Sequence, residues 1–317
     1  MKTPLERIVP APGFGKFALD FLMGEFPSYR REDWLEAAAS GRLLADGERA
    51  DFNAVAGVAR ERRYVFEPPP PREPPIDDSY CFVYEDEHIA VVNKSGNLPC
   101  HPAGSYREHS LSRLLVSRNG FAEAFMVNRL DRETSGLVLA AKTAEAASQC
   151  GRDLMAGLFG KSYVARVAGC WTLPREFTAS GAIRLERGEI VRKKRVFELG
   201  SSEGQACVTI FKLMETDAAN GFSLLQAKPV TGRPHQIRAT LKALGYPVAG
   251  DKLYGPDETI YARLCGDALT PADLAALRGF PRQCLHSHGL SFPHPFTRAS
   301  LAFTAPAPRD MDFVCGA

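Results

Sequence analysis

A single aspartate stands between two arginines in the stretch VNRLDRETSG, residues 127–136. Arg129 lies two positions before Asp131, and Arg132 follows it directly. A nearby guanidinium keeps a carboxylate ionised and oriented, and Gly136 allows a sharp turn into the apolar run that follows. We therefore expect Asp131 on a loop at the entrance of a strand, where reactive side chains often lie. Taken alone, the pattern fits a surface ion pair better.

A second segment, KPVTGRPHQIRATLKALGYPVAGDKLYG at residues 228–255, joins a turn to a basic helix. The sequence predicts the turn at TGRP and a helix from His235 onward, which Gly245 ends. Arg233 and Arg238 could bind phosphates or pair with a carboxylate. On its own, however, a basic amphipathic helix is usually a solvated surface helix.

Together, the two segments resemble motifs of the RluA-type pseudouridine synthases, His-Arg-Leu-Asp-x-x-Thr-Ser-Gly and Gly-Arg-x-His-Gln-Ile-Arg. Further matches occur at YEDEHIAVVNKSGNLPCHP, KSYVARV and RQCLHSHGLSFPHP, in the order that the family has them. The resemblance implies an enzyme that moves the glycosidic bond of a uridine in RNA from nitrogen 1 to carbon 5 of uracil. This reaction implies no cofactor, and we expect no metal site.

The resemblance also assigns roles near the reacting base. Asp131 would be the essential carboxylate, either attacking the anomeric carbon of the ribose or acting as a base. Arg238 would be its salt-bridge partner, which lowers the pKa of the carboxylate and fixes its direction. Tyr163 would stack on the uracil, and Ile237 would form the opposite apolar wall.

Other residues are expected to contact RNA or to help flip the target base out of its stack. Arg129 matches the family's arginine that fills the gap left by the base. Asn128 stands where the family usually has histidine; it cannot titrate, but it can hydrogen-bond RNA or the loop backbone. We expect activity to survive this difference. The full set of residues expected to flip the base or contact RNA is Arg129, Asn128, Arg233, Ile237, His235, Arg192, Lys193 and Lys194.

Composition limits the class of protein. The chain has 317 residues, 45% hydrophobic and 24% charged, with a net charge of +2, so RNA must be met by local basic patches. No apolar stretch of about 18 residues predicts a membrane span, and the first residues lack a signal core. The eight cysteines form no Cys-x-x-Cys pair, which favours reduced thiols in a cytoplasm. Cys284, His286 and His288 alternate, and a strand explains them better than a zinc site.

A proline-rich stretch, EPPPPREPPIDD at residues 67–78, predicts a stiff linker. Residues 1–66 predict two short helices, a hairpin at Asp46-Gly47 and a closing strand at residues 62–66. This order resembles the small alpha-L RNA-binding module, with basic residues Arg30, Arg31 and Arg42 in matching positions. Acidic and basic residues are equally numerous there, so a plain packing domain is an equal alternative.

Residues 79–317 predict an α+β catalytic domain. Strands are expected at YCFVYED, HIAVVNK, GLVLAAKT, KSYVARVAG, ACVTIFKL, FSLLQAKPV and SLAFTAP, and helices at TAEAASQCGRDLMAGL, HQIRATLKALG and ADLAALRG. The resemblance implies the pseudouridine synthase fold, with a mixed, mostly antiparallel sheet and flanking helices.

Two other classes of protein fit the same residues. A non-catalytic RNA-binding protein could retain the same fold, and Asn128 leaves room for it. A glycoside hydrolase would need two nearby carboxylates, for which Glu133 is the close candidate beside Asp131. For the synthase, the expected partner is transfer or ribosomal RNA, without DNA or a membrane, and the expected state is a cytoplasmic monomer.

Overall fold

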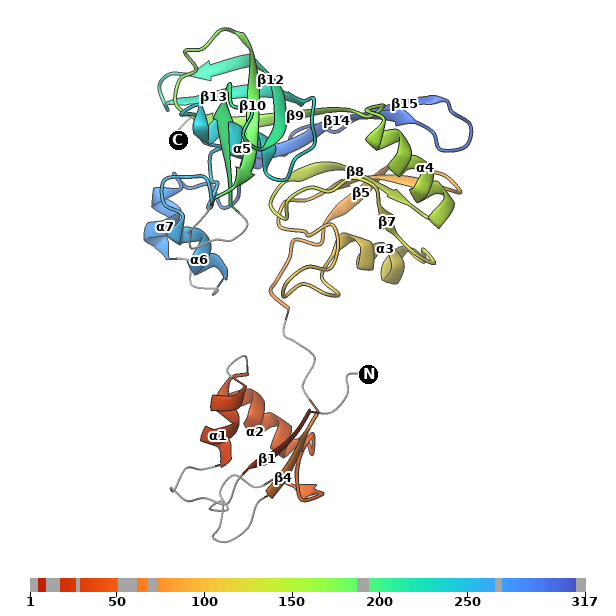
Figure 1. Cartoon of the computed structure of the whole chain (residues 1–317), viewed down its shortest axis with the longest axis vertical. Coiled ribbons are helices and arrows are strands. Elements are labelled where there is room, and N and C mark those ends of the chain that lie inside the picture. Colours follow the sequence, from red (N-terminus) through yellow and green to blue (C-terminus); the bar gives the residue numbers. More distant parts are fainter. Residues whose placement is uncertain are drawn as a thin grey trace. The chain divides into compact units, whose positions relative to one another are not determined.

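The structure is a computed structural model that describes residues 5–9, 18–26, 29–50, 62–67, 73–186, 194–265 and 270–311. It divides the chain into two compact units, Met1–Arg72 and Glu73–Ala317 (Figure 1). Among the described residues, no helix is long and apolar enough to cross a membrane.

The smaller unit packs two helices on a four-stranded sheet of order β1-β4-β2-β3. Its elements are β1 (Leu5–Val9), α1 (Ala18–Glu25), α2 (Arg31–Ala39), β2 (Leu43–Ala45), β3 (Glu48–Arg49) and β4 (Arg62–Phe66). The hairpin predicted at Asp46-Gly47 is confirmed, since both residues have positive φ angles, 54° and 88°. Trp34 is fully buried in a core of its own. The unit therefore has the elements expected of an independent small module.

The junction between the units differs from the expected linker of residues 67–78, because its second half is attached to the larger unit. The Glu73 carboxylate accepts hydrogen bonds from the backbone N–H groups of Arg107, Glu108 and His109, at 2.8, 2.8 and 2.7 Å. Asp77 also donates its N–H to the carbonyl of Asn97. Only residues 68–72, which lie outside the described ranges, separate the described parts of the two units.

The larger unit is built on an eleven-stranded sheet, with main order β11-β10-β12-β13-β9-β14-β8-β6-β5. Its strands are β5 (Tyr80–Glu85), β6 (Ile89–Lys94), β7 (Phe125–Met126), β8 (Ser135–Ala141), β9 (Gly160–Ala168), β10 (Glu176–Leu185), β11 (Arg195–Leu199), β12 (Gln205–Asp217), β13 (Phe222–Pro229), β14 (Leu285–Pro293) and β15 (Ser300–Thr304). Its helices are α3 (Leu111–Asn119), α4 (Ala144–Met155), α5 (Gln236–Ala243), α6 (Thr259–Cys265) and α7 (Pro271–Ala276), followed by a 3-10 turn η1 (Arg309–Met311).

The predicted α+β class is confirmed. Only the β8–β14 pair is parallel, and all the other strand pairs described in this sheet are antiparallel. The strand expected to carry Cys284, His286 and His288 corresponds to β14, with Cys284 just before its start. Each predicted strand and helix of this unit is present, whereas β7, β10, β11, α3 and α6 were not predicted.

Strand β14 joins the two halves of the sheet, because it lies between β9 and β8 (Figure 1). All seven residues of β8 are buried, which explains its continuous apolar sequence. Gly136 has a φ of 110°, and a Cβ there would lie 2.3 Å from the carbonyl oxygen of Ser287. The glycine before LVLAA is thus required by the close approach of β14 as well as by the turn.

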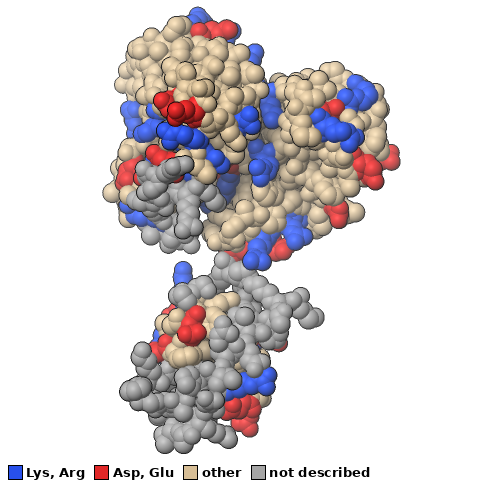
Figure 2. Space-filling view, in the orientation of Figure 1, with Lys and Arg blue, Asp and Glu red and all other residues tan. Residues whose placement is uncertain are grey.

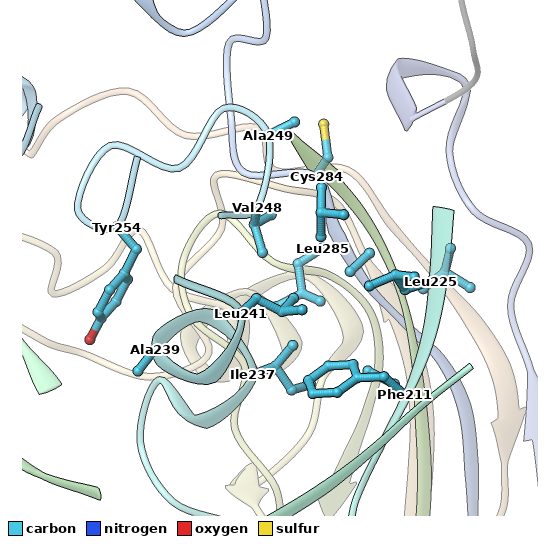
Figure 3. Close-up of a cluster of buried hydrophobic side chains, with 14 of the residues drawn as sticks. Phe211, Leu225, Ile237, Ala239, Leu241, Val248, Ala249, Tyr254, Cys284 and Leu285 are labelled. Atoms are coloured by element: carbon cyan, nitrogen blue, oxygen red, sulfur yellow. The ribbon is translucent and has the colours of Figure 1, made fainter. Parts of the chain in front are cut away.

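Helix α5 covers one half of the sheet and contacts β11, β12 and β13. Its apolar face enters a buried cluster in which Figure 3 shows Ile237 and Leu241 near Phe211 and Leu225. This packing fixes the rotation of the helix, and with it the direction of its polar residues.

Candidate active site

Asp131 lies on the loop between β7 and β8, as predicted. The loop turns tightly there, since the N–H of Thr134 donates to the carbonyl of Asp131 at 3.1 Å. The Asp131 side chain is 31% exposed, and its Oδ2 accepts a hydrogen bond from Nη1 of Arg238 at 2.6 Å. The expected ion pair between the two motifs is therefore present, although 107 positions separate the residues.

A second carboxylate holds Arg238 in place. Asp251 is fully buried and receives both Nε and Nη2 of Arg238, at 2.6 and 2.8 Å. Its Oδ1 also accepts the backbone N–H groups of Leu253 and Tyr254. This two-pronged contact fixes the guanidinium plane and leaves Nη1 for Asp131.

The surroundings keep Asp131 ionised. Burial alone would raise the pKa of Asp131, but the charge of Arg238 and the hydrogen bonds from Arg238 and Gln283 act in the opposite direction and outweigh it. The pKa of Asp131 consequently lies below the ordinary value of an aspartate. The site presents a carboxylate anion, which is the form that nucleophilic or general-base chemistry requires.

Tyr163 of β9 is half-buried and packs against two of the hydrophobic clusters of the larger unit. Burial raises its pKa to about 12, so its hydroxyl stays protonated at neutral pH. The charge of Asp131 contributes to the same rise, which indicates that the two side chains are close. A neutral aromatic ring beside an ionised carboxylate suits a flat, uncharged ligand.

The loop that carries Asp131 is held from behind by a polar network. Glu133 accepts hydrogen bonds from Nζ of Lys252 at 2.8 Å and from the N–H of Gln283 at 3.2 Å. The buried Lys94 donates to the carbonyl of Arg132 at 3.2 Å. A cavity of about 730 Å³ lies behind this loop, and Asp131 does not line it. Because Glu133 is paired with Lys252, it is not a free second carboxylate for glycoside hydrolysis.

Two of the expected RNA contacts are exposed. Arg129 has no hydrogen-bond or ion-pair partner among the described residues. Arg233 precedes α5 and uses only its Nε, on the carbonyl of Ala206. Figure 2 shows Lys and Arg side chains in the hollow between the two halves of the larger unit. Both arginines are available for phosphates or bases.

Three of the expected residues are buried or already paired. Asn128 is 5% exposed, and its Oδ1 accepts the N–H of Leu139 at 2.7 Å, so of the two contacts expected for it, with RNA or with the backbone, the fold shows the backbone contact. Ile237 is 6% exposed and belongs to the core cluster (Figure 3), on which Tyr163 also packs, and its role as an apolar wall of the pocket stays a prediction. Lys194 forms ion pairs with Glu186 and Glu258 and is not a free cation. Arg192 and Lys193 lie outside the described residues.

Sequence reasoning missed three residues of the site, which are Asp251, Tyr254 and Gln283. The first two lie in GDKLYG, residues 250–255, at the end of the segment that carries α5, where an acid near a basic helix was a usable signal. Gln283 donates its side-chain amide to Thr134 and also lowers the pKa of Asp131. Its approach depends on the pairing of β14 with β8, which no local pattern reveals.

Comparison with known proteins places this geometry in context. Residues 88–243 match the family described as RNA pseudouridylate synthase. A Xanthomonas campestris protein named ribosomal large subunit pseudouridine synthase D is 31% identical over 96% of this chain and 90% of its own length. RNA pseudouridine synthase 7 of rice, Oryza sativa, is 32% identical over 76% of this chain, which spans only 60% of that protein. The solved structure of human RNA pseudouridylate synthase domain containing 1 superposes with a TM-score of 0.59 and 26% identity, covering 76% of this chain and 89% of the human one.

Proposed function

Because the chain belongs to the RNA pseudouridine synthase family, we propose that it converts particular uridines of structured RNA into pseudouridine. The observation that carries the proposal is the ionised Asp131, joined at 2.6 Å to an arginine that Asp251 holds from the other side. This arrangement combines an anionic reactive group with a fixed direction. Isomerisation within one nucleoside requires no second substrate.

The proposed roles follow from position and charge. The Asp131 carboxylate faces the ribose of a flipped-out uridine, where it either attacks the anomeric carbon and displaces nitrogen 1 of the uracil, or removes a ribose proton as that glycosidic bond breaks. In both cases the freed uracil then bonds the sugar through carbon 5, which loses its hydrogen to solvent. Tyr163 stacks on the uracil through its neutral ring. The exposed Arg129 occupies the space that the flipped base leaves, and Arg233 binds the RNA backbone.

For the substrate class we favour large-subunit ribosomal RNA, with transfer RNA as the alternative. The Xanthomonas relative carries this substrate in its name, and its match extends over nearly the whole chain, including the smaller unit. We propose that the smaller unit is an RNA-binding module that presents Arg30 and Arg31, whereas Arg42 already pairs with Glu36 at 3.1 Å. The enzyme is proposed to act as a cytoplasmic monomer.

The test is tritium release from RNA labelled at carbon 5 of uridine. Purified ribosomal and transfer RNA pools are offered separately to the wild-type chain and to Asp131→Asn, whose fold is checked by circular dichroism. We expect release from the ribosomal pool by the wild type and none by the variant. Release by a folded Asp131→Asn chain would contradict the role of the carboxylate.

The same assay also distinguishes the synthase from a non-catalytic RNA-binding protein. Release from the transfer RNA pool alone would retain the activity and correct the substrate class. Intact RNA binding with no release from either pool would support the non-catalytic alternative and contradict the proposed activity.

A further inference from the structure

His235 lies between the reactive carboxylate of Asp131 and the buried Tyr254. Its Nε2 is 3.9 Å from Oδ1 of Asp131, and its Nδ1 is 2.9 Å from the hydroxyl of Tyr254. The residue precedes α5 with a φ of 56° and a ψ of 15°, a left-handed conformation that is strained for a side chain with a Cβ. Such strain persists only where the surroundings enforce it. The fold therefore fixes the direction in which this imidazole points.

The hydrogen-bond directions around Tyr254 determine which nitrogen of His235 carries the hydrogen. The backbone N–H of Arg195 donates to the Tyr254 oxygen at 2.8 Å, so that oxygen is already an acceptor. Tyr254 is 1% exposed, and within the described ranges the only acceptor in reach of its own hydrogen is Nδ1 of His235. A neutral His235 must then hold its hydrogen on Nε2, the nitrogen that faces Asp131.

Burial, more than the surrounding charges, leaves His235 neutral. Burial lowers its pKa most; Asp131 and Asp251 act in the opposite direction, and Arg238 and Arg195 add to the lowering. The net result is a pKa below the ordinary value for histidine. At neutral pH the imidazole therefore offers one N–H to the site and no lone pair, because Tyr254 occupies the other nitrogen.

We propose that His235 is a positioning residue whose Nε2–H, locked by Tyr254, orients Oδ1 of Asp131 while Arg238 holds Oδ2. The inference rests on the proposed function and adds a residue pair to it. His235 acts as a hydrogen donor and not as the acceptor of a proton from the substrate. Tyr254 contributes through its hydroxyl, while its ring supports Arg238, whose guanidinium lies 5.0 Å from the ring centre.

The first test is ¹⁵N nuclear magnetic resonance of the full chain labelled on its histidines. The signal of His235, one of seven histidines, is identified by its absence in His235→Gln. We expect the wild type at neutral pH to be uncharged with its hydrogen on Nε2, and Tyr254→Phe to give a mixture of both tautomers. Tyr246→Phe is the matched control, because its hydroxyl bonds Thr172 away from the site. A wild-type His235 that is charged, or that carries its hydrogen on Nδ1, overturns the proposal whether or not any variant folds.

The second test measures turnover on the RNA pool that the wild type modifies. Tyr254→Phe removes the hydrogen bond that fixes His235, which lies 3.9 Å from the reacting carboxylate. Its kcat should fall by about tenfold, with KM unchanged and Tyr246→Phe as active as the wild type. An unchanged kcat in a folded Tyr254→Phe chain contradicts the positioning role. A wild type that binds RNA without releasing tritium contradicts the proposed function instead. In that case the tautomer measurement still tests the His235–Tyr254 hydrogen bond, because it does not depend on activity.

Discussion

One positive charge, that of Arg238, is shared between two carboxylates that have different tasks. Asp251 is fully buried and takes two of its nitrogens, whereas the partly exposed Asp131 takes the third. The more tightly bound acid therefore serves to aim the arginine, and the arginine in turn aims the reactive acid. A guanidinium performs both tasks at once because its donors are fixed in one plane.

The division of tasks predicts the behaviour of Asp251→Asn. Removing one partner of a buried ion pair should lower the free energy of unfolding by about 3–5 kcal/mol, and kcat should fall because Arg238 is no longer aimed. Asp153→Asn is the matched control, since Asp153 is 4% exposed and also forms a two-pronged pair, with Arg298. Urea unfolding and tritium release measure both effects. An Asp251→Asn chain with normal kcat, or a control with an equal loss of kcat, would refute this account.

The depressed pKa of Asp131 predicts the acid side of the pH profile. A carboxylate whose folded-state pKa is lowered stays ionised down to pH values below about 3.9, the ordinary value for aspartate. Its stabilising contribution is present above that value and is lost as the pH falls through the lowered pKa. We expect kcat to stay level between about pH 5 and pH 7 in a chain that remains folded by circular dichroism. A decline of kcat that begins above pH 6 would mean that Asp131 is not held as described.

At the scale of elements, the strands and helices with regular apolar patterns were predictable, and the weakly patterned ones were not. Strand β8 reads as a continuous apolar run, and α5 combines an apolar face with a terminal glycine. In contrast, β10 has only three buried residues among ten, which breaks the alternation expected of a strand. Helix α3 has nine residues and a mixed sequence, too short for a clear period.

The candidate site was predictable only as far as the motifs reach. The resemblance identified Asp131, Arg238 and Tyr163, but it left open whether Asn128 bonds RNA or the backbone, because a motif position carries no information about side-chain direction. In the fold, the Asn128 side-chain amide donates to the carbonyl of Leu137 and accepts the N–H of Leu139, which are bonds that a neighbouring strand would otherwise make to β8. Contacts such as this depend on tertiary structure and have no local signature.

The parallel contact between β8 and β14 predicts a strong effect of Gly136→Ala. The new Cβ would meet the backbone of Ser287 at 2.3 Å, and the φ of 110° is itself unfavourable for alanine. Gly120→Ala is the matched control, because Gly120 also has a positive φ, 70°, but nothing lies within 4 Å of its added Cβ. The control should lose about 1–2 kcal/mol of unfolding free energy, and Gly136→Ala should lose clearly more. Urea titration measures both losses. Equal losses of unfolding free energy would show that the contact between β14 and β8 at Gly136 is not close.

At the scale of the whole molecule, the boundary between the units predicts which fragment is stable. A fragment of residues 73–317 keeps Glu73 and its three backbone hydrogen bonds, whereas a fragment of residues 79–317 leaves those N–H groups without it. The shorter fragment should unfold more easily by about 1–3 kcal/mol, as measured by urea titration. Glu73→Ala in the full chain should reproduce part of the loss. If the two fragments are equally stable, residues 73–78 do not stabilise the larger unit, and the boundary between the units lies at the end of the proline-rich stretch.

The position of β14 also has a consequence for how the protein is made. Asp131 precedes β8 and Tyr163 belongs to β9, yet the strand between β8 and β9 is synthesised long after both. Until residues 285–293 leave the ribosome, β8 and β9 each present an open edge that can pair with a wrong chain. The emerging polypeptide therefore needs protection from aggregation during this interval. The pairing that places the loop of Asp131 and the strand of Tyr163 in one sheet is thus completed only when β14 is in place.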